Sequence, residues 1–400
     1  MQRFSPFLLI SLLALLIAGC AATPPFTQRR VSPPQEPAAP VSSAPLSGIP
    51  KTPAAPIPAV TIEPTLAENT APGKPDASNP HIALILPLNI PAFHQAAEAV
   101  KQGALAAAKA LPGTPPIQIY PTSEDANDLF AAYQKAVDEG ASVIIGPLTK
   151  TAVVTLAESD LVTVPTVALS VPDVEITNHN LYLFGLSLDV EARQVAQYMW
   201  REGHRSVLII SAPNILSKRL KTAFSETWQQ QGGHIAGRFV YTATTNLNTL
   251  QNSAAQVPAD AVFLALNSHD AGLVHPYLPN AMTSYATSQV FTGPTATNIV
   301  DLGGVRFLDM PWMLQADHPA VMVFTRPEKT LNADNERLYA MGVDAYRLAQ
   351  LFYKSAIPAS GIVLDGVTGQ ITLNRQQFTR ELTAAEFQSN TVLILDNAQP

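Results

Sequence analysis

The chain has few side chains arranged in patterns that perform catalysis. None of its eight histidines forms an HExxH or HxH pattern, and His269 and His275, beside Pro276, fit surface positions better than a metal site. No serine is followed three positions later by lysine, and no GxSxG turn, phosphate loop or dinucleotide motif is present. We therefore predict no catalytic residue, no bound metal and no cofactor. A peptidoglycan hydrolase has little support.

Polar and turn residues follow three of the apolar runs in the first part of the chain. They come after residues 82–88, after 143–145 and after 167–169. Ligands of open α/β sheets bind at the carboxyl ends of parallel strands, where helix N-termini present free N–H groups. Asn89, Thr149 and Ser170 could equally serve as caps of the helices that follow, and the sequence leaves both interpretations open. The candidate cleft or ligand-binding residues are Asn89, Gly146, Pro147, Thr149 and Ser170.

The elements that would position these residues alternate regularly after residue 81. Continuous apolar runs, typical of strands buried on both faces, alternate with amphipathic helical segments. Gly140, Gly203 and Gly232 follow helical segments where a C-cap needs a positive φ. This alternation predicts an α/β fold with parallel sheets covered by helices on both faces. The expected strands are 82–86, 117–120, 142–145, 166–169, 207–211 and 261–266, and the expected helices are 92–110, 125–139, 190–202, 218–231 and 335–354.

The predicted body, residues 81–400, is too long for one open sheet. We expect two doubly wound lobes, with lobe one built from 81–185 and 311–357 and lobe two from 186–310 and 358–400. This order requires three chain crossings between the lobes. Residues 361–373 read as two short strands. We expect Trp312 to be buried at the lobe junction, and Asp344 and Arg347 to be spaced for a local ion pair on a helix that packs in an ordinary way.

Composition excludes one large class of partner. The chain carries a net charge of −7 with only 24 lysines and arginines, and it has no basic run. Binding to a nucleic-acid backbone requires a concentrated basic surface. We therefore predict no nucleic-acid partner.

The N-terminus reads as an export signal. A short apolar run follows Arg3 and ends in Ala18, Gly19 and Cys20, and Cys20 is the single cysteine of the 400 residues. These residues resemble the lipobox of bacterial lipoproteins. The resemblance implies that residues 1–19 are removed as a signal peptide and that a diacylglycerol is attached to Cys20. Because no aspartate follows Cys20, it also implies an anchor in the outer membrane, facing the periplasm.

Residues 20–80 have the composition of a tether. They contain 15 of the 35 prolines of the chain, together with many alanines, serines and threonines. Such a segment buries too little apolar surface to offset its chain entropy. We predict a lipidated, proline-rich, disordered tether that holds a folded body away from the membrane.

The body resembles the C-terminal domain of LpoA-type lipoproteins, which activate class A penicillin-binding proteins at the outer membrane. The segments that carry the resemblance run from residue 82 to residue 369, and GVRFLDMPWML and RLYAMGVDAYRL are the most distinctive. The resemblance implies a type I periplasmic binding protein-like fold and a class A penicillin-binding protein as partner, with peptidoglycan as an open second contact. The matching segments are 82–88 (IALILPL), 145–148 (IGPL), 184–187 (FGLS), 191–193 (EAR), 304–314 (GVRFLDMPWML), 337–348 (RLYAMGVDAYRL) and 366–369 (GVTG).

Two features depart from that family's pattern. Long members carry an N-terminal domain of tetratricopeptide-like helical repeats, and here the proline-rich tether stands in its place. Amino-acid binders of this fold use a cluster of cleft hydroxyls, whereas the strand end at 168–170 leaves only Ser170. The leading hypothesis is a non-catalytic regulator of peptidoglycan synthesis. The alternative is a lipid-anchored periplasmic solute-binding receptor.

Overall fold

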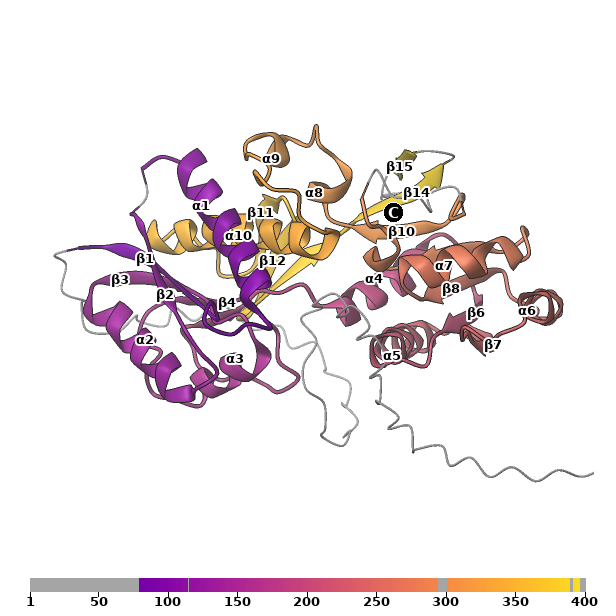
Figure 1. Cartoon of the computed structure of the whole chain (residues 1–400), viewed down its shortest axis with the longest axis horizontal. Helices are drawn as coiled ribbons and strands as arrows, with labels where there is room; N and C mark the ends of the chain where they lie inside the picture. The colour runs from indigo at the N-terminus through magenta and orange to yellow at the C-terminus, as the bar shows by residue number, and fades with distance from the viewer. Residues whose placement is uncertain (1–78, 114, 294–300, 389–390, 396–400) are drawn as a thin grey trace, which may run out of the picture. The chain divides into compact units, whose positions relative to one another are not determined.

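The computed structural model describes residues 79–113, 115–293, 301–388 and 391–395 (Figure 1). The predicted signal peptide, Cys20 and all but the last two residues of the predicted tether lie outside these ranges. Within them, no helix combines the length and the apolar character that crossing a membrane requires.

The first sheet has eight strands in the order β11-β12-β13-β5-β4-β3-β1-β2. Neighbouring strands from β1 to β5 pair in parallel, whereas β11, β12 and β13 pair with one another antiparallel. A parallel contact between Gln377 and Leu183 joins β13 to β5. The strands are β1 His81–Leu86, β2 Ile117–Pro121, β3 Ala141–Ile145, β4 Thr166–Ala168, β5 Leu181–Leu183, β11 Gly361–Gly366, β12 Gly369–Asn374 and β13 Gln377–Glu381.

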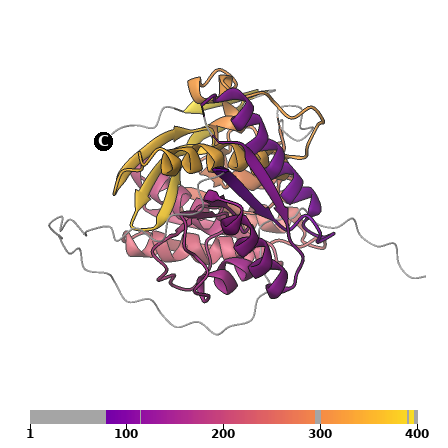
Figure 2. The ribbon, with the colours of Figure 1, turned by 90° about the vertical axis from the view of Figure 1, so that its left-hand side faces the viewer.

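Helices cover both faces of this sheet (Figures 1 and 2). On one face α1 (His94–Ala110) packs along α10 (Ala333–Tyr353), and on the other α2 (Ala126–Asp138) lies beside α3 (Lys150–Ala157). Successive side chains of β1 point to opposite faces. Ile82, Leu84 and Leu86 therefore join the core under α1 and α10, and Ala83 and Ile85 join the core under α2 and α3.

The second sheet has seven strands in the order β15-β14-β10-β9-β8-β6-β7. Its parallel part is again covered on both faces, by α4 (Leu188–Arg201) and α5 (Ile215–Gln230) on one side and by α6 (Leu247–Ala254) and α7 (Ser268–Val274) on the other. Two short helices, α8 (Pro311–Leu314) and α9 (Pro319–Met322), precede α10. The strands are β6 Ser206–Ser211, β7 His234–Val240, β8 Ala261–Ala265, β9 Thr283–Ala286, β10 Arg306–Asp309, β14 Thr383–Gln388 and β15 Thr391–Leu395.

The predicted lobe division is wrong for one segment. Residues 358–400 were expected in lobe two, but β11, β12 and β13 extend the first sheet, and only β14 and β15 belong to the second. The physical reason is that β5 is three residues long and its free edge is covered by β13. The chain still crosses between the sheets three times in the described ranges, and the third crossing lies at Leu382 instead of near residue 358.

Several local predictions are confirmed. Gly140, Gly203 and Gly232 have φ values of 95°, 92° and 89° after their helices. Trp312 is fully buried, its indole N–H donates to Glu336 at 2.8 Å, and the Arg326 guanidinium lies 4.0 Å from its ring centroid.

Two glycines allow the backbones of α1 and α10 to touch. A Cβ atom on Gly103 would overlap the carbonyl oxygen of Tyr339, and one on Gly342 would overlap the carbonyl oxygen of Val100. Because both obstacles are helix backbone, they cannot swing away as a side chain would. The contact of α1 with α10 is the most extensive between any two elements of the described chain, so it supports the whole face of the first sheet.

We expect Gly103→Ala to destabilise the body by about 1–3 kcal/mol, because the added methyl separates two packed helices. Helix propensity alone predicts the opposite sign, a gain of about 1 kcal/mol for alanine over glycine. Urea unfolding followed by circular dichroism measures the change. Lys109→Ala, at an exposed position near the end of the same helix, is the matched control and should shift stability by less than about 0.5 kcal/mol. A more stable Gly103→Ala chain would contradict the close contact.

Candidate functional site

Both sheets share one strand order in their parallel part. It is β2-β1-β3-β4-β5 in the first sheet and β7-β6-β8-β9-β10 in the second. In this order the helices that leave neighbouring central strands go to opposite faces, so the loops separate at the carboxyl ends of those strands. The first sheet therefore has a crevice where β1 and β3 end.

A cavity of about 360 Å³ fills this position in the first lobe. Its volume falls in the range of roughly 300–1,000 Å³ that is usual for small-molecule sites. The lining comes from the loops that follow β1, β2, β3 and β4, from the starts of α1, α2 and α3, and from one residue of α10. It is mainly apolar, with Ile90, Phe93, Leu129, Leu148 and Leu338 among its members.

The cavity also has specific polar groups. Thr122 follows β2 and Ser170 follows β4, each residue is only 4% exposed, and neither hydroxyl bonds to another residue in the described chain. Because both residues line the cavity, their hydroxyls can donate and accept hydrogen bonds with a molecule held there. Lys150 adds a cation, and its ammonium contacts both carboxylate oxygens of Asp173 at 3.1 Å.

The structure brings together three of the five residues predicted from the sequence. Pro147, Thr149 and Ser170 line the cavity, whereas Asn89 and Gly146 are not among its walls. Thr149 also caps α3, because its hydroxyl accepts from the Ala152 amide at 3.3 Å. Thr149 therefore both caps α3 and lines the cavity.

The two remaining residues have other surroundings. Asn89 is exposed and does not cap α1, whose N-cap is Phe93. Gly146 has a φ of +112°, and a Cβ atom there would overlap the carbonyl oxygen of Ile85 on the neighbouring strand. Gly146 is thus required for the close approach of β3 to β1. Ser170 caps no helix, because a turn and β5 follow it.

Sequence reasoning missed Thr122 and Phe93. The rule that selected Ser170 also selects Thr122, because it is the first polar residue after β2. Phe93 carried no such signal. An aromatic residue at a helix start is usually assigned to the core, and only the placement of three helix starts around one crevice shows it as a cavity wall.

Little space remains where the chain first crosses between the sheets. A second cavity, lined by residues that include Gly185, Ser187 and Arg219, measures about 10 Å³, which is room for at most about one water molecule. The Arg219 guanidinium forms an ion pair there with Asp189. Of these two cavities, the one in the first lobe is the larger.

Comparison with known proteins places this geometry in a family. The model of the family described as "LppC putative lipoprotein" matches residues 74–390. A penicillin-binding protein activator LpoA from Enterobacter sp. (strain 638) is 27% identical over 341 residues, which cover 74% of this chain and 46% of the relative. The corresponding protein of Yersinia pseudotuberculosis is 26% identical and covers 71% of this chain and 51% of its own. The chain thus spans about half the length of the curated relatives it matches.

Solved structures show the same fold. The C-domain of LpoA from Haemophilus influenzae, described as a regulator of PBP1A, has a TM-score of 0.64 at 23% identity and covers 79% of this chain and 99% of its own. A Chromobacterium violaceum structure described as a "putative branched-chain amino acid ABC transporter" has a TM-score of 0.68 at 36% identity, covering 76% and 99%. The predicted type I periplasmic binding protein-like fold is confirmed. Since the family model covers the cavity, the whole first sheet and all strands of the second sheet except β15, the chain belongs to the LppC lipoprotein family.

Proposed function

We propose that this envelope lipoprotein binds and activates a class A penicillin-binding protein and thereby regulates peptidoglycan synthesis. The observation that carries the proposal is the match to curated LpoA activators, which extends over 74% of the chain. The fold of the LpoA C-domain, described as a regulator of PBP1A, supports it. Binding stimulates an enzyme only if the activator prefers the enzyme's active conformation. The activator itself then needs no catalytic residue.

The proposed position in the cell follows from the N-terminus. Membership of a lipoprotein family supports a diacylglycerol on Cys20, and the residues after it favour the outer membrane with the body in the periplasm. From there the body would reach a synthase, and the adjoining peptidoglycan is a second surface it could contact. With only 24 lysines and arginines and a net charge of −7, the composition does not support a nucleic-acid partner.

Purified mature chain should increase the cross-linking activity of a class A penicillin-binding protein that polymerises lipid II. The reason is that a bound activator shifts the synthase toward its active state. Muropeptide analysis of the product, with and without the lipoprotein, measures the cross-linked fraction. The control is the lipoprotein alone on purified peptidoglycan. Unchanged cross-linking would contradict activation, and cleavage products in the control would point to a hydrolase.

The cavity favours one second candidate, a periplasmic solute-binding receptor. Thr122 and Ser170, each only 4% exposed, line a mainly apolar cavity of about 360 Å³, and this combination suits a small amphipathic molecule. The Chromobacterium violaceum structure at 36% identity, described as a "putative branched-chain amino acid ABC transporter", supports an amino acid as the first class to test.

Thermal unfolding in the presence of each of the twenty amino acids tests this receptor. A ligand at a concentration 100 times its Kd stabilises the folded chain by about 2.7 kcal/mol and raises the melting temperature. The double variant Thr122→Val, Ser170→Ala should lose that increase. If the same variant still stimulates the synthase fully, solute binding and activation are separate properties. Absence of any shift across the panel would count against an amino-acid receptor.

A further inference from the structure

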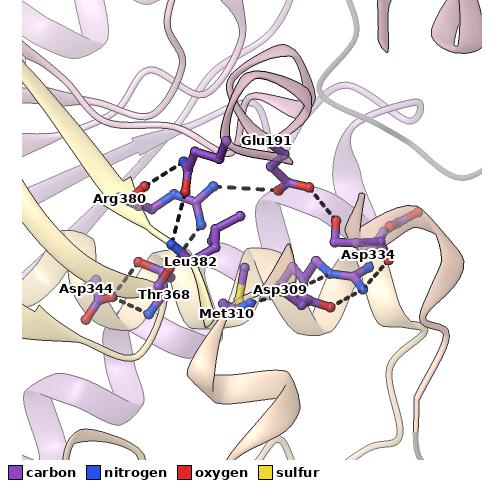
Figure 3. A network of polar contacts seen from close by, with 11 residues as sticks. Glu191, Asp309, Met310, Asp334, Asp344, Thr368, Arg380 and Leu382 are labelled. Atoms are coloured by element: carbon purple, nitrogen blue, oxygen red, sulfur yellow. Dashed lines mark hydrogen bonds and ion pairs between the residues drawn. The ribbon is translucent and has the colours of Figure 1, made fainter. Parts of the chain in front are cut away.

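A buried polar cluster that includes Glu191, Asp309 and Arg380 connects segments beside the three chain crossings, and Figure 3 shows its contacts. Glu191 lies in the first turn of α4, just after the first crossing. Asp309 ends β10, just before the second crossing, and Arg380 lies one residue before the end of β13, just before the third. All three residues are at most 7% exposed. The charged groups therefore sit where the two sheets are connected.

Arg337 on α10 is the central member of this cluster. It belongs to the helix that packs on the first sheet, yet its guanidinium binds groups of the second-sheet side. Its Nε donates to Asp309 Oδ1 at 3.1 Å and its Nη2 to Asp309 Oδ2 at 2.6 Å. The same Nη2 donates to the carbonyl oxygens of Ser288 at 3.0 Å and Phe291 at 2.7 Å. One side chain thus joins an α10 turn to β10 and to the segment after β9.

A second connection runs between α4 and β13. The Ser288 hydroxyl donates to Glu191 at 2.6 Å, and the other Glu191 oxygen lies 3.8 Å from Arg380 Nη2. Arg380 donates in turn to the carbonyl oxygen of Thr368 at 3.1 Å. Gln194, one turn further along α4, bonds to the Arg380 carbonyl at 2.8 Å and to the Leu382 amide at 3.1 Å, so it holds the third crossing directly.

The two connections differ in electrostatic character. Burial alone would lower the pKa of Arg337, but the adjacent Asp309 carboxylate raises it above the usual range. Burial raises the pKa of Glu191 and lowers that of Arg380, and the attraction between them, over 3.8 Å, only partly opposes this. Arg337 with Asp309 is therefore the firm contact, and Glu191 with Arg380 is the weaker one.

Apolar packing is continuous across the same region. One core contains Ile82 and Leu84 of the first sheet together with Val207 and Ile209 of the second, and Trp312 belongs to it as well. Relative rotation of the sheets would have to separate these side chains and also expose the carbonyl oxygens that Arg337 holds. Interfaces packed in this way change between discrete arrangements instead of deforming gradually.

We propose that Arg337 forms a fixed contact that prevents the two sheets from rotating against each other at the crossings. The body would then present one preformed surface to its partner. Its two lobes would not rotate toward each other around a bound solute. This inference does not depend on the identity of the partner. It concerns the relative motion of the sheets, which can be measured in the free protein.

Double electron–electron resonance between two spin labels provides the measurement. The full chain carries Cys20→Ser, which removes its single cysteine, and the labels are attached at Ala131→Cys on α2 and Asn252→Cys on α6, both exposed positions. We expect one narrow distance distribution in this parent chain. Arg337→Lys keeps the charge but loses the planar fork, so the single narrow distribution should be lost.

Arg347→Lys is the matched control. Arg347 is on the same helix, but it binds Asp344 on that helix at 2.8 Å and the Asp365 carbonyl on β11, both on the first-sheet side. Its replacement should leave the distribution unchanged. If Arg337→Lys fails to fold by circular dichroism, Asp309→Asn replaces it. Two distances in the parent chain would overturn the proposal that Arg337 fixes the sheets. A folded Arg337→Lys chain whose distance distribution is as narrow as that of the parent would overturn it as well.

Discussion

Replacing Arg337 by methionine should lower the free energy of unfolding by about 3–5 kcal/mol, the usual cost of removing one partner from a buried ion pair. The side chain of Asp309 is 1% exposed and would keep a charge without its cation. The carbonyl oxygens of Ser288 and Phe291 would lose a charged donor as well. Urea unfolding of the wild-type and variant chains measures the difference.

A second replacement separates the ion pair from the packing around it. The double variant Arg337→Met, Asp309→Leu removes both charges and should recover part of the lost stability, because no isolated carboxylate remains buried. The control Lys135→Met removes an exposed partner of Glu139, 3.9 Å away, and should change stability by less than about 1 kcal/mol. Equal losses for Lys135→Met and Arg337→Met would show that burial does not govern the effect.

Deleting forty residues of the proline-rich segment, 35–74, should abolish the function of the lipoprotein in cells. If the segment serves only as a spacer, its length determines whether an anchored body reaches a synthase. Proline fixes φ near −65° and extends a chain beyond a Gly/Ser coil of equal length. Complementation of a strain that lacks the lipoprotein measures the loss. The same deletion, without lipid, should stimulate the synthase normally in solution.

The matched control keeps the length and changes the order. Scrambling residues 25–78 at constant composition should leave complementation intact. Cys20→Ser reports on the anchor, because an unlipidated chain should leave the membrane fraction. A scrambled segment that fails while the shortened one complements would show that these residues contain a binding motif.

The sequence predicted those parts of the fold in which the local pattern of apolar residues determines the secondary structure. Strands buried on both faces form continuous apolar runs, so β1, β3, β6 and β8 were predicted to within one residue at each end. β7 was missed because none of its residues is fully buried and its sequence, HIAGRFV, has no continuous apolar run. The position of β11 to β13 was mispredicted for another reason, since they join the first sheet through the pairing of β13 with β5, a tertiary contact that local pattern does not encode.

The sequence predicted only part of the candidate site. Strand ends selected Pro147, Thr149 and Ser170, because parallel strands bring their carboxyl ends to one edge. The α10 helix shows the limit of such reasoning. The spacing of Asp344 and Arg347 predicted their ion pair, found at 2.8 Å, but ordinary packing was expected around them. Instead Arg337 and Asp344 are buried with partners from distant segments, such as Asp309 and Thr368, which no local pattern reveals.

The sheet order also constrains how the protein is made. Strand β10 pairs on one side with β14, so the second sheet stays incomplete until residues 383–388 have been synthesised and exported. Until then the edge of β10 is open to pairing with other chains, a hazard for a nascent polypeptide. A chain that stops translation after β13 would carry a finished first sheet and an unfinished second one. Such a product should aggregate or be degraded, so quality control in the envelope would discard the protein if its last strands were missing.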